Sequence, residues 1–493
     1  MSGARSLKLN FLINLSSPLI RIAVALVSVP LYVHHVGNAR YGVISLVWIL
    51  LGYAGFLDLG MSRASVNALA KLRNAPQSER SRVLVTTLTV NFGLGLAAAV
   101  VGYAAAYVIF SHFMKVPDDL MPEIRKALPW IAGMVPVSFL LGAGFGAMES
   151  RERFGIVNIL QSLNMTLGQI LPVVVAITIG PSLAYIIPAT AIASYFVVAI
   201  TLVIVLRDEA PLRFSSFSFV RVKGLLSYGG WISVSNLLGI LLVTVDQMMI
   251  GAVVGVASVA YYAVAGRFVI QSQIFSNTVA RTLFPRMSHV SPAEASRLAA
   301  RALVAIAYGY GAAIATAIVL TPTFFHFWLG DAFASVSGPL AQIMFVGALF
   351  NAFQVAPLHL LQAQGRPDIP SKMNAVEVFP FFGALWWATH HFGLTGAAVV
   401  WTLRNCFEAA TMLWASKMPR SSVLSVVPAV ALAFIAIVVA YAVGPSMSLA
   451  LPAAAIIGVV SLAVAFSQCE DLRRIALAAT ARFTSFRSLR DPA

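Results

Sequence analysis

Long apolar runs follow one another along almost the whole chain, and they restrict it to one class of fold. About 20 consecutive apolar residues in a helix span the hydrocarbon core of a bilayer. The sequence contains about fourteen such runs, at 10–33, 42–62, 83–110, 128–148, 156–179, 184–206, 226–250, 259–280, 302–327, 338–361, 373–390, 395–415, 425–444 and 449–467. Only 10% of the 493 residues are charged, against about 25% in soluble domains. We therefore expect an all-α polytopic membrane protein.

Basic residues gather on one side of the predicted spans. With a cytoplasmic N-terminus, the outside segments hold only Arg40, Lys115, Arg125 and Lys126 of the 33 Lys and Arg residues. This asymmetry follows the positive-inside rule, and an even number of spans places both termini in the cytoplasm. The net charge of +15 is thus explained by topology and does not indicate a nucleic-acid partner. The first run is too long for the apolar core of a signal peptide and is expected to be a retained span.

A polar break near the midpoint predicts two halves. The expected domains are an N-terminal lobe of six helices, a cytoplasmic linker, a second lobe of six helices, two further helices and a basic cytoplasmic tail, at 1–206, 207–225, 226–418, 419–467 and 468–493. Sliding the second half onto the first aligns VGNARYG (36–42) with VGVASVA (254–260) and Arg63 with Arg281. Halves of equal orientation are expected for parallel repeats.

Two arginines lie inside predicted spans without a carboxylate nearby on the same helix. A polar stripe on one face of the first span is formed by Asn14, Ser17, Arg21 and Ser28. Arg267 and Gln271 share a face of the eighth span. An arginine at the centre of a span costs roughly 2.5–3.5 kcal/mol on insertion scales, so such residues usually face a bundle interior. Arg21 and Arg267 are expected either to bind an anionic ligand or to pair with Asp246, Glu377 or another carboxylate across the bundle.

Further charged residues have two open interpretations. Arg63 and Arg281 lie at inner span ends and suit an entry gate or simple positive-inside anchors, with Asp58 neutralising Arg63. Arg404 and Glu408 are four residues apart and predict an intrahelical pair.

Intramembrane carboxylates and amides complete the candidate site residues. Asp246 and Glu377 have no opposite charge nearby in sequence, so either could carry a coupling proton or a sodium ion. Asn158, Gln161, Asn351 and Gln354 could contact sugar hydroxyls or hydrogen-bond between helices. The histidines lack metal-ligand spacing, the two cysteines form no zinc pattern, and no nucleotide-binding or hydrolase motif occurs. We expect no cofactor, no metal and no enzymatic activity.

Two segments resemble a known family. VPLYVHHVGNARYGVISLVWILLGYAGFLDLGMSRA (29–64) and LLQAQGRPDIP (360–370) are similar to segments of Wzx-type polysaccharide flippases, in the multidrug/oligosaccharidyl-lipid/polysaccharide exporter superfamily. The resemblance implies two six-helix lobes in a V around a central cationic cavity. It also implies alternating-access translocation of an undecaprenyl-diphosphate-linked oligosaccharide across the bacterial cytoplasmic membrane, for O-antigen, capsule or exopolysaccharide synthesis.

The same resemblance implies roles for the arginines. Arg21, Arg63 and Arg267 occupy places that match cavity arginines of the related lipid II flippases, but a further arginine near the first is absent, which makes lipid II a less expected cargo. Arg21 and Arg267 would hold the diphosphate, because guanidinium is permanently charged and binds phosphate oxygens bidentately. Arg63 and Arg281 would contribute at the inner end. The expected partners are the lipid-linked oligosaccharide, membrane lipids and other polysaccharide-assembly proteins.

Three alternatives remain open at this stage. A drug/cation antiporter of the same superfamily would favour a cavity lined by carboxylates. A membrane polysaccharide polymerase or lipid-dependent glycosyltransferase would need substantial outside loops, and the longest here is 111–126. A non-transporting scaffold for polysaccharide assembly would not need arginines within its spans.

Overall fold

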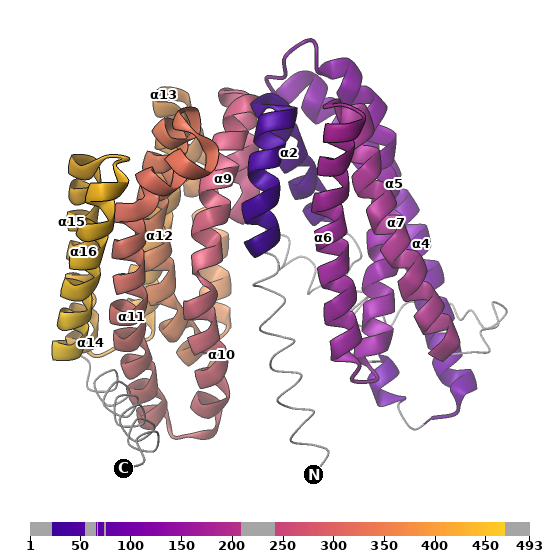
Figure 1. Ribbon diagram of the computed structural model, residues 1–493. Helices are drawn as coiled ribbons and strands as arrows, with labels where there is room; N and C mark the ends of the chain where they lie inside the picture. Colours follow the sequence, from indigo (N-terminus) through magenta and orange to yellow (C-terminus); the bar gives the residue numbers. More distant parts are fainter. Residues whose placement is uncertain (1–21, 55–65, 67, 73–74, 209–241, 469–493) are drawn as a thin grey trace, which may run out of the picture. The chain divides into compact units, whose positions relative to one another are not determined.

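The fold is described from a computed structural model, which places all residues except 1–21, 55–65, 67, 73–74, 209–241 and 469–493 (Figure 1). Every regular element in these described ranges is a helix. The chain forms two compact units, Met1–Ala260 (unit 1) and Tyr261–Ala493 (unit 2).

Unit 1 is built around a bundle of four long helices. Its described helices are Ile22–Val36, α2 (Asn38–Ala54), α4 (Gln77–Val108) with the π-helical turn η1 (Ile109–Phe113), α5 (Met121–Glu149), α6 (Phe154–Thr178), α7 (Leu183–Asp208) and Leu242–Val253. The helix α5 packs against α4 and α7, and α7 packs against α6. Gly95 allows α4 to approach α5 closely, since a Cβ there would lie 2.5 Å from the Pro136 Cα. Leu84, Leu141 and Val197 fill the core between these helices.

Polar contacts join the helix ends of unit 1 that the distribution of Lys and Arg predicts to lie on the outer side of the membrane. Arg40 at the start of α2 forms a two-point ion pair with Glu123 of α5, at 2.7 and 3.0 Å. The Leu183 N–H at the start of α7 donates to Glu123 Oε2 at 2.8 Å. Lys115 N donates to the Gly251 carbonyl at 3.0 Å. Contacts at this end therefore join α2, α5 and α7, and they join the segment before α5 to the helix Leu242–Val253.

Unit 2 surrounds the long helix α11. Its helices are α9 (Val256–Ser272, which begins in unit 1), α10 (Ile274–His289), α11 (Pro292–Leu329), α12 (Asp331–Ala363), α13 (Asp368–Ala415), α14 (Arg420–Leu424), α15 (Val427–Val443) and α16 (Met447–Gln468). Ser291 caps α11 by accepting from the Glu294 N–H, with Pro292 at the first helical position. The helix α11 packs against α10, α12, α15 and α16.

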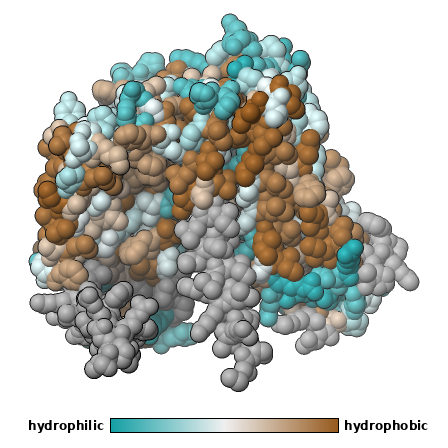
Figure 2. Space-filling view, in the orientation of Figure 1, coloured by the Kyte–Doolittle hydropathy of each residue, from teal (hydrophilic) through white to brown (hydrophobic). Residues whose placement is uncertain are grey.

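The lateral surfaces of the helices suit a lipid environment. Eight described helices are long and apolar enough to cross a membrane. Large apolar side chains stand exposed on them, for example Val100, Phe196 and Val438. Over α4 to α7, apolar side chains cover the flank and hydrophilic ones gather at the helix ends (Figure 2). The all-α membrane fold is confirmed.

The predicted spans agree with the helices, whereas two finer predictions stay open. Where the chain is described, each predicted run falls on helix apart from turn residues at the ends of the runs 156–179 and 425–444, with an extra break at Gln273 between α9 and α10. The total of about fourteen crossings stays a prediction. The predicted domain bounds also stay a prediction, because the predicted linker at 207–225 lies almost entirely outside the described residues. The two compact units are divided in the sequence after Ala260.

Candidate functional site

A turn inside α13 creates the candidate site. Gly393 has φ +58° and ψ −137° and interrupts the helix. Just beyond it, a Cβ on Gly396 would lie 2.1 Å from the Ala388 carbonyl oxygen, so the chain folds back tightly at two glycines. Glu377 and Arg404, 27 residues apart, would be about 40 Å apart along a straight helix. The turn brings them into contact.

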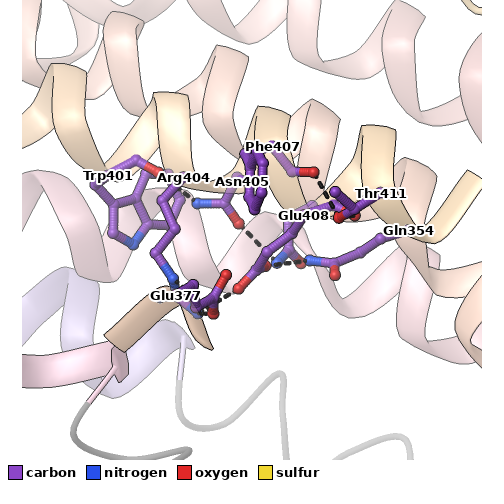
Figure 3. A network of polar contacts seen from close by, with 9 residues as sticks. Gln354, Glu377, Trp401, Arg404, Asn405, Phe407, Glu408 and Thr411 are labelled. Carbon is purple, nitrogen blue, oxygen red and sulfur yellow. Dashed lines mark hydrogen bonds and ion pairs between the residues drawn. The ribbon is translucent and has the colours of Figure 1, made fainter. Parts of the chain in front are cut away.

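Arg404 joins two carboxyl groups. Its Nε and Nη2 donate to Glu377 Oε1 at 3.2 and 3.0 Å, and Nη2 also contacts Glu408 Oε1 (Figure 3). The Arg404–Glu408 contact is the i, i+4 pair that the spacing predicts. The guanidinium carbon lies 5.0 Å from the centroid of the Phe381 ring, a distance at which an aromatic face attracts a cation. We call Glu377, Arg404 and Glu408 the charge network.

The charge network is buried. The side chains of Arg404, Glu377 and Glu408 are only 12%, 6% and 8% exposed. Burying charges is unfavourable unless they are paired and hydrogen-bonded. The three groups meet this requirement largely through one another.

Two amides of α12 extend the charge network. Gln354 Nε2 donates to Glu408 Oε2 at 2.9 Å, and Asn351 Nδ2 donates to Asn405 Oδ1 at 2.8 Å. Each donor is 54 residues before its acceptor, so α12 and the second half of α13 run parallel here. Asn405 Nδ2 donates in turn to the Trp401 carbonyl at 2.8 Å. These bonds fix the carboxyl-bearing helix against its neighbour.

Sequence reasoning missed most of this arrangement. It paired Arg404 with Glu408 alone, and it offered Glu377 as a partner of Arg21 or Arg267 or as a carrier of a coupling ion, but not as a partner of Arg404. The available signal was the repeated spacing of three residues, Asn351 to Gln354 and Asn405 to Glu408, which places two polar rungs on facing helices. The contact of Glu377 depends on the turn at Gly393 and has no comparable local signal.

The other described candidate residues lie on helices other than α12 and α13. Arg267 and Gln271 are half-buried on α9, and Asn158 and Gln161 are half-buried on α6. Asp246 is buried, and its Oδ1 accepts from the Gln247 N–H at 2.8 Å.

Other candidates fall outside the description. Arg281 lies on α10, but its side chain is not described. The residues Asn14, Ser17, Arg21, Asp58 and Arg63 lie outside the described residues altogether. The diphosphate site formed by the arginines therefore stays a prediction. Among the described residues, no group of His, Cys, Asp and Glu side chains could hold a metal ion.

Solved structures of transporters share the fold. The chain is similar to a structure titled "Lipid II flippase MurJ, inward closed conformation", with a TM-score of 0.75 and 13% identity, over 94% of this chain and 99% of that one. It is also similar to an inward-facing multidrug resistance MATE family transporter of the MOP superfamily, with a TM-score of 0.64 and 14% identity, over 85% of this chain and 98% of that one. At such identities the likeness establishes the fold.

Sequence comparison leads to the family. The chain is 24% identical over 411 residues to the "Putative O-antigen transporter" of Shigella flexneri, covering 81% of this chain and 95% of the relative. These similar proteins are transporters and not enzymes, in agreement with the sequence analysis. The family model described as "Polysaccharide biosynthesis protein" matches residues 7–291, more than half of the chain. The chain belongs to this polysaccharide biosynthesis protein family.

Proposed function

We propose that this protein is a flippase, which moves an undecaprenyl-diphosphate-linked oligosaccharide from the inner to the outer leaflet of the bacterial cytoplasmic membrane. The observation that carries the proposal is the similarity to an O-antigen transporter over 81% of the chain and 95% of that relative. The fold shared with a lipid II flippase supports it. The product would serve the synthesis of O-antigen, capsule or exopolysaccharide.

The proposed mechanism assigns the head group to arginines. Arg21 and Arg267 bind the diphosphate, and Arg63 and Arg281 attract it at the cytoplasmic end. The polyprenyl tail stays in lipid while the sugars pass between two six-helix lobes that alternate between the faces. A membrane potential that is positive outside favours outward movement of the anionic head group.

Neutral polar side chains are proposed to contact the sugars, with one revision. The candidates are Asn14, Ser17, Asn158, Gln161 and Gln271. Asn351 and Gln354 are left out, because an amide donor of each is engaged by Asn405 or Glu408. Their role is to support the charge network.

The test is a depletion experiment that reports on which leaflet holds the substrate. Cells lacking the protein should accumulate lipid-linked oligosaccharide in the inner leaflet, where a membrane-impermeant glycosidase cannot reach it. Wild type should restore access, whereas Arg21→Ala should not, at equal membrane levels. Arg125→Ala removes an arginine that is predicted to lie outside and serves as the matched control.

Other results would favour other functions. Normal translocation by Arg21→Ala would contradict the proposed phosphate contact. Unchanged lipids with altered sensitivity to cationic dyes would indicate an antiporter. Undiminished translocation with unpolymerised units outside would indicate a polymerase.

A further inference from the structure

The charge network contains one more acid than base. Among the described residues, Arg404 is the cation that contacts both Glu377 and Glu408. With both carboxyl groups ionised, the three buried side chains would carry a net charge of −1. An uncompensated charge inside a membrane protein is costly. The network therefore calls for one further positive charge.

The two carboxyl groups also meet at one nitrogen. Glu377 Oε1 and Glu408 Oε1 both accept from Arg404 Nη2, so a single guanidinium nitrogen lies between them. Ionised carboxylates only accept hydrogen bonds, so a bond between two of them requires a proton on one. Both oxygens of Glu408 already accept from nitrogen donors, Oε1 from Arg404 and Oε2 from Gln354. A proton between the two acids would supply the missing positive charge without displacing either donor.

We propose that Glu377 and Glu408 share one proton, so that the charge network is a proton-binding site inside unit 2. The proton belongs to the pair and not to either residue alone. Its use in transport rests on the proposed flippase function.

The surroundings favour a proton over a metal cation. Arg404 contacts both carboxyl groups, so a sodium ion between them would lie beside a guanidinium. Gln354 turns its NH₂ group, and not its oxygen, toward Glu408. Both features repel a cation that needs several oxygen ligands, whereas a proton needs only one lone pair on each acid.

Titratable groups on the described helices beside the network can be named. Among these helices, α12 packs most extensively against α13, and it brings the neutral amides of Asn351 and Gln354 to the network. His359 of α12 contacts Gln362 instead, at 3.0 Å. Lys372 of α13 is exposed and pairs with Asp368 at the helix start. Within the described chain, the charge change on proton release is thus met by Arg404.

Proton release has a structural consequence. It leaves two carboxylates beside one guanidinium. Glu377 lies on the first half of α13 and Glu408 on the second half, so the repulsion between the carboxylates acts between the two halves. The two halves are joined at the turn at Gly393. Proton binding would hold the halves together, and proton release would loosen them.

Infrared spectroscopy of purified protein in lipid tests the site without transport. Wild type at neutral pH should show the C=O stretch of a protonated carboxyl group. Glu377→Gln and Glu408→Gln should each lose this band, because the one remaining carboxylate is neutralised by Arg404. Glu294→Gln, at an exposed acid of α11, should keep it. A spectrum that is the same in wild type and both network variants would overturn the proposal, and so would a band that sodium abolishes at constant pH.

A transport assay separates this proposal from the proposed function. In proteoliposomes with lipid-linked oligosaccharide, a pH gradient should change the flipping rate of wild type, and this response should be lost in Glu377→Gln and Glu408→Gln. Flipping that ignores the gradient in wild type would refute the proton's role while the flippase stands. If wild type shows the expected C=O band but translocates no lipid-linked oligosaccharide, the proposed flippase function is wrong and the proton site is supported.

Discussion

A single guanidinium, that of Arg404, holds side chains from both halves of α13 and, through Glu408, from α12. Spacing predicts its pair with Glu408, because four residues form about one helical turn. No such rule predicts its pair with Glu377, which depends on the angle at which the chain turns at Gly393. Local contacts of the candidate site could thus be predicted from sequence, and contacts across the turn could not.

Arg404→Ala is expected to destabilise the protein strongly. Removing one partner of a buried ion pair costs about 3–5 kcal/mol, since the other partner is left without compensation. Adding Glu377→Gln and Glu408→Gln to Arg404→Ala should restore part of the loss by removing the orphaned acids. Thermal unfolding in detergent measures the effect of both the single and the triple variant.

Lys372→Ala is the control: it breaks an exposed ion pair on the same helix and should change the stability little. A loss equal to that of Lys372→Ala would show that the buried pairs contribute nothing.

At the scale of elements, apolar runs predict helices well and breaks within them poorly. The run at 259–280 predicts one helix, whereas the chain is interrupted at Gln273 between α9 and α10. No glycine or proline lies at that break, but Ser272 Oγ donates to the Val269 carbonyl at 2.6 Å just before it, a side-chain contact that competes with regular helix. Close helix approaches are likewise invisible in sequence, because a glycine does not reveal which helix it meets.

Gly42 marks such an approach and gives a prediction. A Cβ on Gly42 of α2 would lie 1.8 Å from the Val256 carbonyl oxygen at the start of α9. Gly42→Ala should therefore lower the free energy of unfolding by about 1–3 kcal/mol or more, as overpacking does.

The matched control is Gly52→Ala on the same helix, where a Cβ would meet nothing within 4 Å. Alanine there should leave stability unchanged or raise it by about 0.5–1 kcal/mol, because glycine weakens helix interiors. Thermal unfolding of the two variants in one detergent separates the effects. Equal midpoints for the two variants would mean that α2 and α9 do not approach this closely.

At the scale of the molecule, the long apolar runs suffice to predict the class of fold. In lipid the backbone must be satisfied within helices or a closed barrel, and uninterrupted apolar runs of about 20 residues fit helices. The division into lobes is harder to predict. The polar break at 207–225 is the visible boundary in sequence, yet the helix Leu242–Val253 belongs to unit 1. Its contacts there include Thr244 Oγ1 with the Tyr53 hydroxyl at 2.5 Å. Polarity marks where a chain leaves the membrane, and packing decides which unit a helix joins.

The topology of the whole chain can be tested with single cysteines. Lys126 is predicted outside and Cys469 inside, since an odd number of predicted spans separates them. In a Cys406→Ala background, a membrane-impermeant maleimide should label Cys469 only after cells are permeabilised. With Cys469→Ala added, Lys126→Cys should be labelled in intact cells. Labelling of both positions from the same side would mean an even number of crossings between them, and the predicted cytoplasmic placement of one terminus would be wrong. Labelling of Lys126→Cys from outside and of Cys469 from inside would support the topology in which an anionic head group moves outward with the membrane potential.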